Sequence, residues 1–481
     1  MRQMMRLTII CLLAFAAAAC STMGRSTTRP SPTTRTVEVY LTTGDRAKLL
    51  HREADVRFGD SHAAPIATIE VNSELAYQEI VGFGAALTDA SAWLIQHKLA
   101  PPQREALLLE LFGRDPGLGF SFVRLDMGAS DFSLRHYSYD DMPAGQTDPT
   151  LANFSIAADR AESIPILKRA LAINPHLSVM ASPWSAPGWM KTTGSMIKGT
   201  LRTDAYESFA EYFRKFIDAY AAEGVPIYAI TVQNEPHFEP DNYPGMRLEP
   251  AARARFVGEH LGPLFARRAI RTRILDWDHN WDEPNSPLQV LADTTARQYV
   301  SGVAWHCYGG DVSAQSVVHD AYPGKDAFFT ECSGGDWAPR FADNLVWTVR
   351  TLIIGATRNW ARGVLMWNLA LDEQHGPHTG GCANCRGVVT INSANGTVTR
   401  NEEYYAFAHA SRFVRPGAHR IASSSGIEGI ESVAFRNADD GSQVLIVVNT
   451  NAREKTFAVH AAGRSVRYTL PAGAVVTLLW K

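Results

Sequence analysis

Two glutamates stand where buried strands are expected to end, which makes them the first candidates for chemistry. Glu235 follows the apolar, β-branched run 227–232, and Glu331 ends a second run, 327–331. Short apolar runs bounded by Pro and Gly are typical of buried parallel strands. Two carboxyl groups at the same end of a parallel barrel are the pair that glycoside hydrolysis uses, one as proton donor and the other as nucleophile or base.

The neighbours of these glutamates suggest which role each takes. Asn234 precedes Glu235 and can bind a sugar 2-hydroxyl, a contact that strengthens as an oxocarbenium-like transition state forms. Tyr308 is expected on the neighbouring strand, where its hydroxyl can hold Glu331 ionised as the nucleophile. The charge of Glu331 then favours a protonated Glu235, the general acid. We therefore predict a retaining mechanism with the carboxyl groups about 5–5.5 Å apart.

The segments that would position these residues alternate between strand and helix patterns. Apolar residues at three- and four-residue spacing mark helices between most strands, as in Phe209, Tyr212, Phe213, Phe216 and Tyr220. A last helix is expected over 402–413. The predicted strands are 80–87, 121–127, 177–183, 227–232, 273–277, 300–308, 327–331 and 363–369. Eight such units predict an α/β fold, a (β/α)₈ TIM barrel.

Both flanks of the barrel show a different pattern. Short alternating or β-branched runs separated by Gly, Asn and Pro are typical of an antiparallel sandwich. They lie at 444–448, 456–459, 466–470 and 474–479, and Thr36–Thr42 reads as an edge strand of the same sheet. The prediction is an appended antiparallel β-sandwich built from N-terminal strands (36–75) and a C-terminal part (416–481), with the barrel over 76–415.

The N-terminus reads as an export signal. Arg2 and Arg6 precede the apolar stretch 7–19, which is too short to span a bilayer as a mature helix. The stretch ends at Cys20, which resembles a bacterial lipobox, although Ala17 stands where Leu is usual. Residues 1–20 are thus a signal peptide, either of a lipoprotein anchored at Cys20 or of a protein cut after the small residues. Residues 21–35 read as a flexible tether. We expect a periplasmic or outer-membrane lipoprotein, or otherwise a secreted protein.

Four cysteines remain in the globular part, and two of them invite two interpretations. Cys382 and Cys385, with His375 and His378, suggest zinc. All four lie in one short Gly-rich loop, whereas structural zinc sites usually pair two separated knuckles. We therefore expect a disulfide or free thiols here, and neither a metal nor a cofactor in the site. The chain has 46 basic and 49 acidic residues that are scattered, so nucleic acid is not an expected partner.

Taken in order along the chain, these motifs resemble glycoside hydrolase family 30, the glucosylceramidase-like group with catalytic glutamates on strands four and seven. The matching segments are 82–89 (Gly-Phe-Gly-Ala-Ala-Leu-Thr-Asp), 131–133, 181–185, 231–236, His306, 330–331 and 367–371. The resemblance covers nearly the whole mature chain, and it implies Glu235 as acid/base and Glu331 as nucleophile.

The resemblance also implies the residues that bind the sugar. They are Asp131, Trp184, Asn234 and Trp367, with His306 and Tyr308 beside them. An Asp can bind two hydroxyls, and indole faces stack on sugar C–H surfaces. Three departures from the family pattern leave the substrate beyond the first sugar open: Asp126 replaces Pro, Cys307 replaces an aromatic residue, and the loop 375–386, expected close to the aglycone, differs from that of the lipid-cleaving animal members.

Several functions remain open at this stage. The leading one is hydrolysis of β-glucosides, including a glucosylceramide-type glycolipid, with endo-β-1,6-glucanase or β-xylosidase activity as alternatives within the family. A catalytically silent surface carbohydrate-binding protein is an alternative from another class. A metal-dependent hydrolase using His306, Asp276, Asp278 or His279 lacks the helical His-x-x-x-His geometry.

Overall fold

The computed structural model describes residues 36–60 and 66–481. The predicted signal peptide and tether lie outside the described residues. Within these residues, no helix combines the length and the apolar character needed to cross a membrane.

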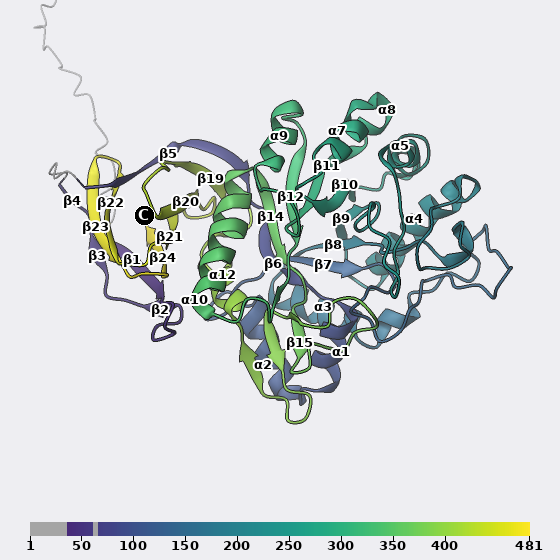
Figure 1. Cartoon of the computed structure of the whole chain (residues 1–481), viewed down its shortest axis with the longest axis horizontal. Coiled ribbons are helices and arrows are strands. Elements are labelled where there is room, and N and C mark those ends of the chain that lie inside the picture. Colours follow the sequence, from purple (N-terminus) through teal and green to yellow (C-terminus); the bar gives the residue numbers. More distant parts are fainter. Residues whose placement is uncertain (1–35, 61–65) are drawn as a thin grey trace, which may run out of the picture. The chain divides into compact units, whose positions relative to one another are not determined.

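A closed barrel of eight parallel strands forms the centre of the fold, which confirms the predicted fold class (Figure 1). Each predicted strand is present, with ends that differ by a few residues. Around the barrel the order is β10-β11-β12-β14-β6-β7-β8-β9. The bounds are β6 (Gly82–Ala86), β7 (Phe122–Asp126), β8 (Ser178–Ser182), β9 (Ile227–Thr231), β10 (Arg273–Asn280), β11 (Val300–His306), β12 (Asp326–Glu331) and β14 (Ala361–Met366).

Helices follow the strands and cover the outside of the barrel. The apolar stripe predicted at Phe209–Tyr220 is the buried face of α4, which confirms that helix. A π-helical segment, Thr348–Gly355, continues α10. The helices are α1 (Asp89–His97), α2 (Pro101–Phe112), α3 (Ser163–Ile173), α4 (Tyr206–Ala222), α5 (Pro250–Arg255), α6 (Gly262–Arg267), α7 (Asn285–Ala292), α8 (Thr294–Arg297), α9 (Ala314–Ala321), α10 (Phe341–Trp347), α11 (Ala356–Arg358) and α12 (Glu402–Ser411).

An apolar layer fills the barrel interior below the strand ends that carry the polar side chains. Phe122, Met180, Leu275, Phe328 and Leu365, from five different strands, pack into one fully buried cluster. Such a packed layer is what makes a TIM barrel a solid core rather than a pore. Polar groups of the same strands are therefore displaced toward the carboxyl ends, where they can meet one another.

An 11-stranded sheet unites N- and C-terminal strands, as predicted. Two details differ from the expectation. β1 is not an edge, because it pairs with β24 on one side and with β2 and β3 on the other. β22 pairs with β5 in parallel, so the sheet is not wholly antiparallel. The strands are β1 (Thr36–Thr42), β2 (His51–Arg52), β3 (Val56–Arg57), β4 (Gly59–Asp60), β5 (Thr68–Glu79), β19 (His419–Ser423), β20 (Ile430–Arg436), β21 (Gln443–Asn449), β22 (Lys455–Ala461), β23 (Arg464–Leu470) and β24 (Val475–Trp480).

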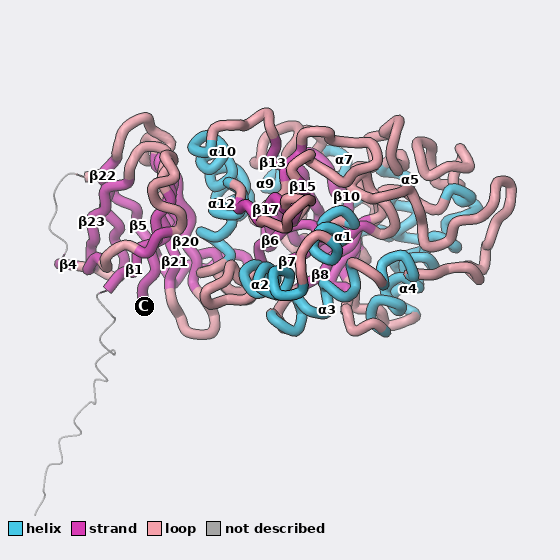
Figure 2. The backbone as a smooth tube through the Cα atoms, turned by 90° about the horizontal axis from the view of Figure 1, so that it is seen from below, coloured by secondary structure: helices cyan, strands magenta, loops and turns pink. Residues whose placement is uncertain are grey.

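Helix α12 connects the barrel to this sheet (Figure 2). Its His409 is fully buried, with Nδ1 2.9 Å from the hydroxyl of Thr477 in β24 and Nε2 2.8 Å from that of Thr42 in β1. Burial lowers the pKa of His409 to about 3. The ring is therefore neutral in the folded protein, while in the unfolded chain it titrates near its ordinary pKa.

This histidine predicts acid destabilisation. Between pH 6.5 and pH 4, His409 binds a proton in the unfolded chain but not in the folded protein. The free energy of unfolding therefore falls by about 3 kcal/mol from this group alone. His409→Gln is expected to flatten the dependence by that amount in denaturant unfolding curves measured at both pH values. His419→Gln, at the partly exposed start of β19, serves as the control. Identical pH dependence in His409→Gln and the unaltered protein would contradict the assignment.

Among the described residues, three short strand pairs lie outside the barrel and the large sheet. β13 (Gly334–Gly335) pairs with β16 (Cys385–Arg386), which ties the segment after β12 to the loop 375–386. β15 (Ala370–Asp372), β17 (Val389–Ile391) and β18 (Val398–Arg400) form a three-stranded sheet after β14. These pairs fix the loops that border the strand ends.

Candidate active site

A cavity of about 750 Å³ opens at the carboxyl ends of the barrel strands. Its volume lies within the range of small-molecule sites. Seven of the eight site residues predicted from sequence line it, and the eighth, His306, lies fully buried directly behind the two glutamates. The seven are Asp131, Trp184, Asn234, Glu235, Tyr308, Glu331 and Trp367.

Glu235 is held by a strained turn just after β9. Its φ is +44°, a left-handed conformation that is uncommon outside glycine, and its backbone N–H donates to the carbonyl of Asp278 at 3.0 Å. Asn234 is anchored in the same way on the carbonyl of Pro183, at 2.8 Å. Strain of this kind persists only where the surroundings over-determine it, and it concentrates at functional sites.

Glu331 is the last residue of β12, and both of its oxygens accept hydrogen bonds. Arg124 donates from Nη1 to Oε2 at 2.5 Å, and the Tyr308 hydroxyl donates to Oε1 at 3.0 Å. The predicted hydrogen bond between Tyr308 and Glu331 is thus confirmed. Two donors, one of them cationic, satisfy the ionised form of this carboxyl.

Asp278 organises the floor of the site. It is the extra residue of a bulge in β10, where the register with β11 shifts between Trp277 and His279, and its φ is +56°. The bulge aims the carboxylate into the barrel. Asp278 is fully buried and accepts hydrogen bonds from side chains of four other strands, namely Arg124, Ser182, Thr231 and Thr330, at 2.7–2.8 Å. Burial would raise the pKa of Asp278, but the charge of Arg124, the hydrogen bond and charge of His306 and the bond from Thr231 outweigh burial and hold it far below its usual value.

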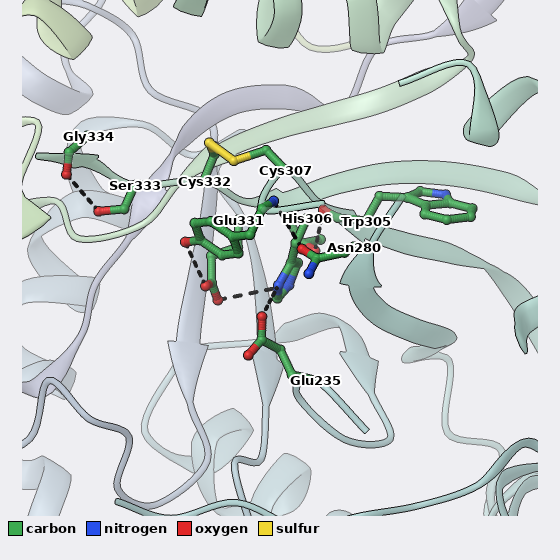
Figure 3. Close-up of a disulfide and its surroundings, with 11 residues drawn as sticks. Glu235, Asn280, Trp305, His306, Cys307, Glu331, Cys332, Ser333 and Gly334 are labelled. Carbon is green, nitrogen blue, oxygen red and sulfur yellow. Dashed lines mark hydrogen bonds and ion pairs between the residues drawn. A yellow bond between two sulfur atoms is a disulfide. The ribbon is translucent and has the colours of Figure 1, made fainter. Parts of the chain in front are cut away.

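His306 stands between the two glutamates (Figure 3). Its Nδ1 is 3.2 Å from Glu235 Oε1, while its Nε2 is 3.0 Å from Asp278 Oδ1 and 3.9 Å from Glu331 Oε2. Burial alone would lower its pKa, but the surrounding carboxylates outweigh burial and raise the pKa of His306 to about 9. The imidazole therefore carries a proton next to Glu235 near neutral pH.

The order of protonation differs from the one expected from sequence. Burial raises the pKa of Glu331 above its usual value, against the opposing charges of His306 and Arg124. Burial also acts on Glu235, but the hydrogen bond from His306 and the charge of His279 outweigh it and lower the pKa of Glu235. The reason is distance, because the imidazolium lies closer to Glu235 than to Glu331. His306 Nδ1 therefore lies within hydrogen-bond distance, 3.2 Å, of the carboxyl group that would serve as the acid.

Two tryptophans form one wall of the cavity. The rings of Trp184 and Trp367 stack at 5.1 Å between centroids, and Arg124 Cζ lies 4.8 Å from the centre of the Trp184 ring. Asp131 lines the same cavity, and burial together with the charges of Glu331 and Glu235 raises the pKa of Asp131 to about 8. These groups offer apolar faces and hydrogen-bonding oxygens to one ligand, which suits a sugar ring.

Sequence reasoning missed three residues of the site. Arg124 was not singled out, and Asp278 and His279 entered only as ligands of a discounted metal. The signal for Arg124 was present, since a charged residue in the middle of a buried strand requires a buried partner. No pattern indicated the bulge that turns Asp278 inward. Further cavity residues lie on loops after the strands, among them Phe238, Tyr243, Ser333 and Trp337.

Two disulfides border the site, and they answer the question left open by the cysteines. Cys382 pairs with Cys385 in the loop 375–386. Cys307 pairs with Cys332, a bridge that was not predicted. The second disulfide joins the residue after Glu331 to the residue between His306 and Tyr308 (Figure 3). It therefore ties together the strand ends that carry the two partners of the hydrogen bond between Tyr308 and Glu331.

Loss of the Cys307–Cys332 bridge is expected to reduce both stability and turnover. For a sequence separation of 25 residues, Cys307→Ser/Cys332→Ser should lower the free energy of unfolding by about 3 kcal/mol. kcat should fall more than KM rises, because Tyr308 loses its fixed position against the nucleophile. Denaturant unfolding and steady-state kinetics test this. The double variant Cys382→Ser/Cys385→Ser, with a separation of 3, is the comparison, and an equal loss in both variants would contradict the expectation.

The chain belongs to glycoside hydrolase family 30. The profile of the glycosyl hydrolase family 30 TIM-barrel domain matches residues 80–414, and that of the family's β-sandwich domain matches residues 417–478. The resemblance stated from the motifs is thereby confirmed, and the chain is an O-glycosyl hydrolase of this family.

Individual relatives differ in the activity that their names give. An endo-1,6-β-D-glucanase of Aspergillus fumigatus is 38% identical over 408 residues, 80% of this chain and 81% of that protein. The solved endo-β1,6-glucanase BT3312 is 36% identical, covers 92% of this chain and 99% of its own, and superimposes with a TM-score of 0.84. A putative glucosylceramidase of Caenorhabditis elegans is 31% identical over 453 residues, 86% of this chain and 82% of that protein.

Proposed function

We propose that this chain is a retaining glycosidase that cleaves β-1,6-linked glucan. The observation that carries the reaction is the pairing of Glu235 and Glu331, brought to one cavity by β9 and β12 and connected through His306. The substrate rests on the relatives, since those at 38% and 36% identity are named endo-β-1,6-glucanases, whereas the putative glucosylceramidase is 31% identical.

In the first half-reaction, Glu331 attacks the anomeric carbon and the glycosidic oxygen leaves. Arg124 and Tyr308 hold the attacking carboxylate in place through its two oxygens. Glu235 gives its proton to the leaving oxygen, and the proton is replenished from His306 Nδ1, 3.2 Å away. The product is a glycosyl ester on Glu331, with the aglycone released.

In the second half-reaction, Glu235 acts as base. It removes a proton from water, which attacks the anomeric carbon and frees Glu331. Asn234 is fixed by Arg124, which donates from Nη2 to its Oδ1 at 2.7 Å. The Asn234 amide can then donate to a sugar 2-hydroxyl, and this contact strengthens in both transition states.

The rim of the cavity supports a substrate longer than one sugar. Phe238, Tyr308 and Trp337 line it with about half of each side chain exposed. Exposed large aromatic residues beside a catalytic cavity offer stacking faces for further sugar rings. They also offer apolar contacts to a glycolipid, so a glucosylceramide-type substrate is the second candidate.

A hydrolysis assay on three substrates tests the proposal: a β-1,6-linked glucan, an aryl β-xyloside and glucosylceramide in detergent micelles. Rapid release of β-1,6-linked oligosaccharides, with the others slower by at least about tenfold, supports the proposal. Proton NMR of the first product should show the β-anomer before mutarotation, because two displacements restore configuration. An α-anomer as first product would refute the retaining mechanism, and glucosylceramide as the preferred substrate would refute the substrate assignment.

We also propose that the protein acts outside the cytoplasm. The support is the signal-like sequence of residues 1–20 and two disulfides in the described residues, since structural disulfides are typical of oxidising compartments. Attachment through lipidated Cys20 is part of this proposal. Cell fractionation with labelled palmitate tests it, and a label that persists in Cys20→Ala would refute the anchor.

A further inference from the structure

Three side chains with metal-binding atoms meet at the proposed acid/base residue: Glu235, His279 and His306. One ligand atom of each lies within 4.8 Å of the others. Glu235 Oε1 is 3.2 Å from His306 Nδ1 and 3.5 Å from His279 Nδ1. Two ligands bound to tetrahedral zinc at 2.0–2.1 Å lie about 3.3 Å apart. These two separations therefore match the edges of a zinc coordination tetrahedron.

His279 has no direct part in the proton transfers of the hydrolytic mechanism. The residue is only 9% exposed, lines the cavity, and packs its ring against that of Trp277 at 5.1 Å. Its Nδ1 is buried and makes no hydrogen bond with any described residue, although it faces Glu235. A buried ring nitrogen without a partner is costly. A metal ion bound between this nitrogen and the carboxylate of Glu235 would give the nitrogen a partner.

His306 is already oriented as a metal ligand. Its Nε2 donates to Asp278 Oδ1 at 3.0 Å, and Asp278 is itself held by Thr330 at 2.7 Å. This hydrogen bond fixes the ring and leaves Nδ1 directed at Glu235 (Figure 3). A histidine that donates its second N–H to a buried carboxylate is the usual support of a zinc-binding imidazole.

The charges around the three ligands also suit a divalent cation. Glu235, Asp278 and Glu331 are carboxylates, and Arg124 is the cation that contacts two of them. Arg124 and the protonated His306 offset two of these three charges, so one negative charge remains. Buried charge without a counterion is unfavourable, so a divalent ion would stabilise the arrangement.

We propose that Glu235, His279 and His306 form an inhibitory site for a transition-metal ion of the Zn²⁺ type. The ion binds Glu235 Oε1 and the two ring nitrogens, and the proton on His306 Nδ1 passes to solvent. Its fourth position faces the cavity. While Glu235 is a ligand, it cannot protonate the leaving oxygen, so hydrolysis stops until a chelator removes the metal.

Titration of metal-free protein tests the binding directly. Isothermal titration calorimetry with Zn²⁺ should give one site per chain, and Co²⁺ should produce the intense visible absorption of a tetrahedral complex. His279→Gln and Glu235→Gln should each weaken binding by about tenfold or more, since even the loss of a supporting partner costs that much. His460→Gln is the matched control, because His460 lies beside Glu70 on the β-sheet with Nδ1 2.6 Å from its carboxylate.

These outcomes distinguish metal binding at the three ligands from metal binding at the protein surface. They also distinguish failure of this proposal from failure of the proposed function. Equal affinity in the unaltered protein and both site variants, or a loss in His460→Gln, would overturn the proposal. Thermal unfolding of each variant shows whether it is folded, and Glu235→Gln gives a second reading if His279→Gln is not. The binding measurement uses no substrate, so it stays decisive if none of the glycosides is cleaved. On any glycoside that is cleaved, Zn²⁺ should inhibit, EDTA should restore activity, and undiminished turnover with the site filled would refute inhibition.

Discussion

Glu331→Gln is expected to lower kcat on the cleaved glycoside by a factor on the order of 10⁴ to 10⁶, the range seen when a nucleophile is removed from an enzyme that works by covalent catalysis. The amide is a poor nucleophile and cannot form the glycosyl ester. Gln keeps the size of the side chain and an oxygen that can accept from Arg124 Nη1, so the fold should survive. Steady-state kinetics with circular dichroism at the same protein concentration provide the measurement.

Glu373→Gln is the matched control for this substitution. Glu373 is exposed on the segment after β15, where its carboxylate accepts hydrogen bonds from Ser393, and it does not line the cavity. Its turnover should stay within about twofold of the unaltered protein, as expected for a surface substitution. A Glu331→Gln protein that retains more than a hundredth of normal kcat would mean that another group performs the attack.

Arg124→Met is expected to lower the free energy of unfolding by about 3–5 kcal/mol, because it leaves buried carboxylates without their counterion. Arg124 is fully buried, and its guanidinium donates to Glu331, Asp278 and Asn234. Burial would lower the pKa of Arg124, but the charges of Asp278 and Glu331 outweigh burial and raise it. Denaturant unfolding at neutral pH measures the loss.

Two further variants show whether position or charge matters. Arg160→Met removes an ion pair with Glu223 in which Arg160 is 59% exposed, and it should cost less than about 1 kcal/mol. Arg124→Lys keeps the charge but lacks the planar fork, so it should recover part of the stability while kcat remains low. If Arg124→Met unfolds at the same denaturant concentration as Arg160→Met, the buried network does not hold the site together.

Much of the reactive centre follows from the sequence alone. Buried parallel strands need apolar residues at successive positions, so the polar residues that interrupt them at Glu235 and Glu331 mark the strand ends. In a parallel barrel all carboxyl ends lie on one face, so these residues had to converge. The alternation of strands with amphipathic segments such as the α4 stripe likewise determined the barrel, because each pattern has its own period.

The tertiary structure alone decided which groups support the glutamates. In the sequence, Arg124 is a single charged residue within β7. Only the closed barrel places it against Glu331, Asn234 and Asp278 at once. Asp278 faces inward because β10 is bulged, and a bulge depends on the pairing of two strands rather than on either one.

The same reason accounts for the other differences. Cys307 and Cys332 pair because β11 and β12 are neighbours whose last residues, His306 and Glu331, are in register. β1 is covered on both sides because β2 and β3 fold back onto it. Local sequence determines which segments are strands and where their polar ends fall. Contacts between residues far apart in the chain determine strand register and inward direction, and with them the hydrogen bond between His306 and Glu235.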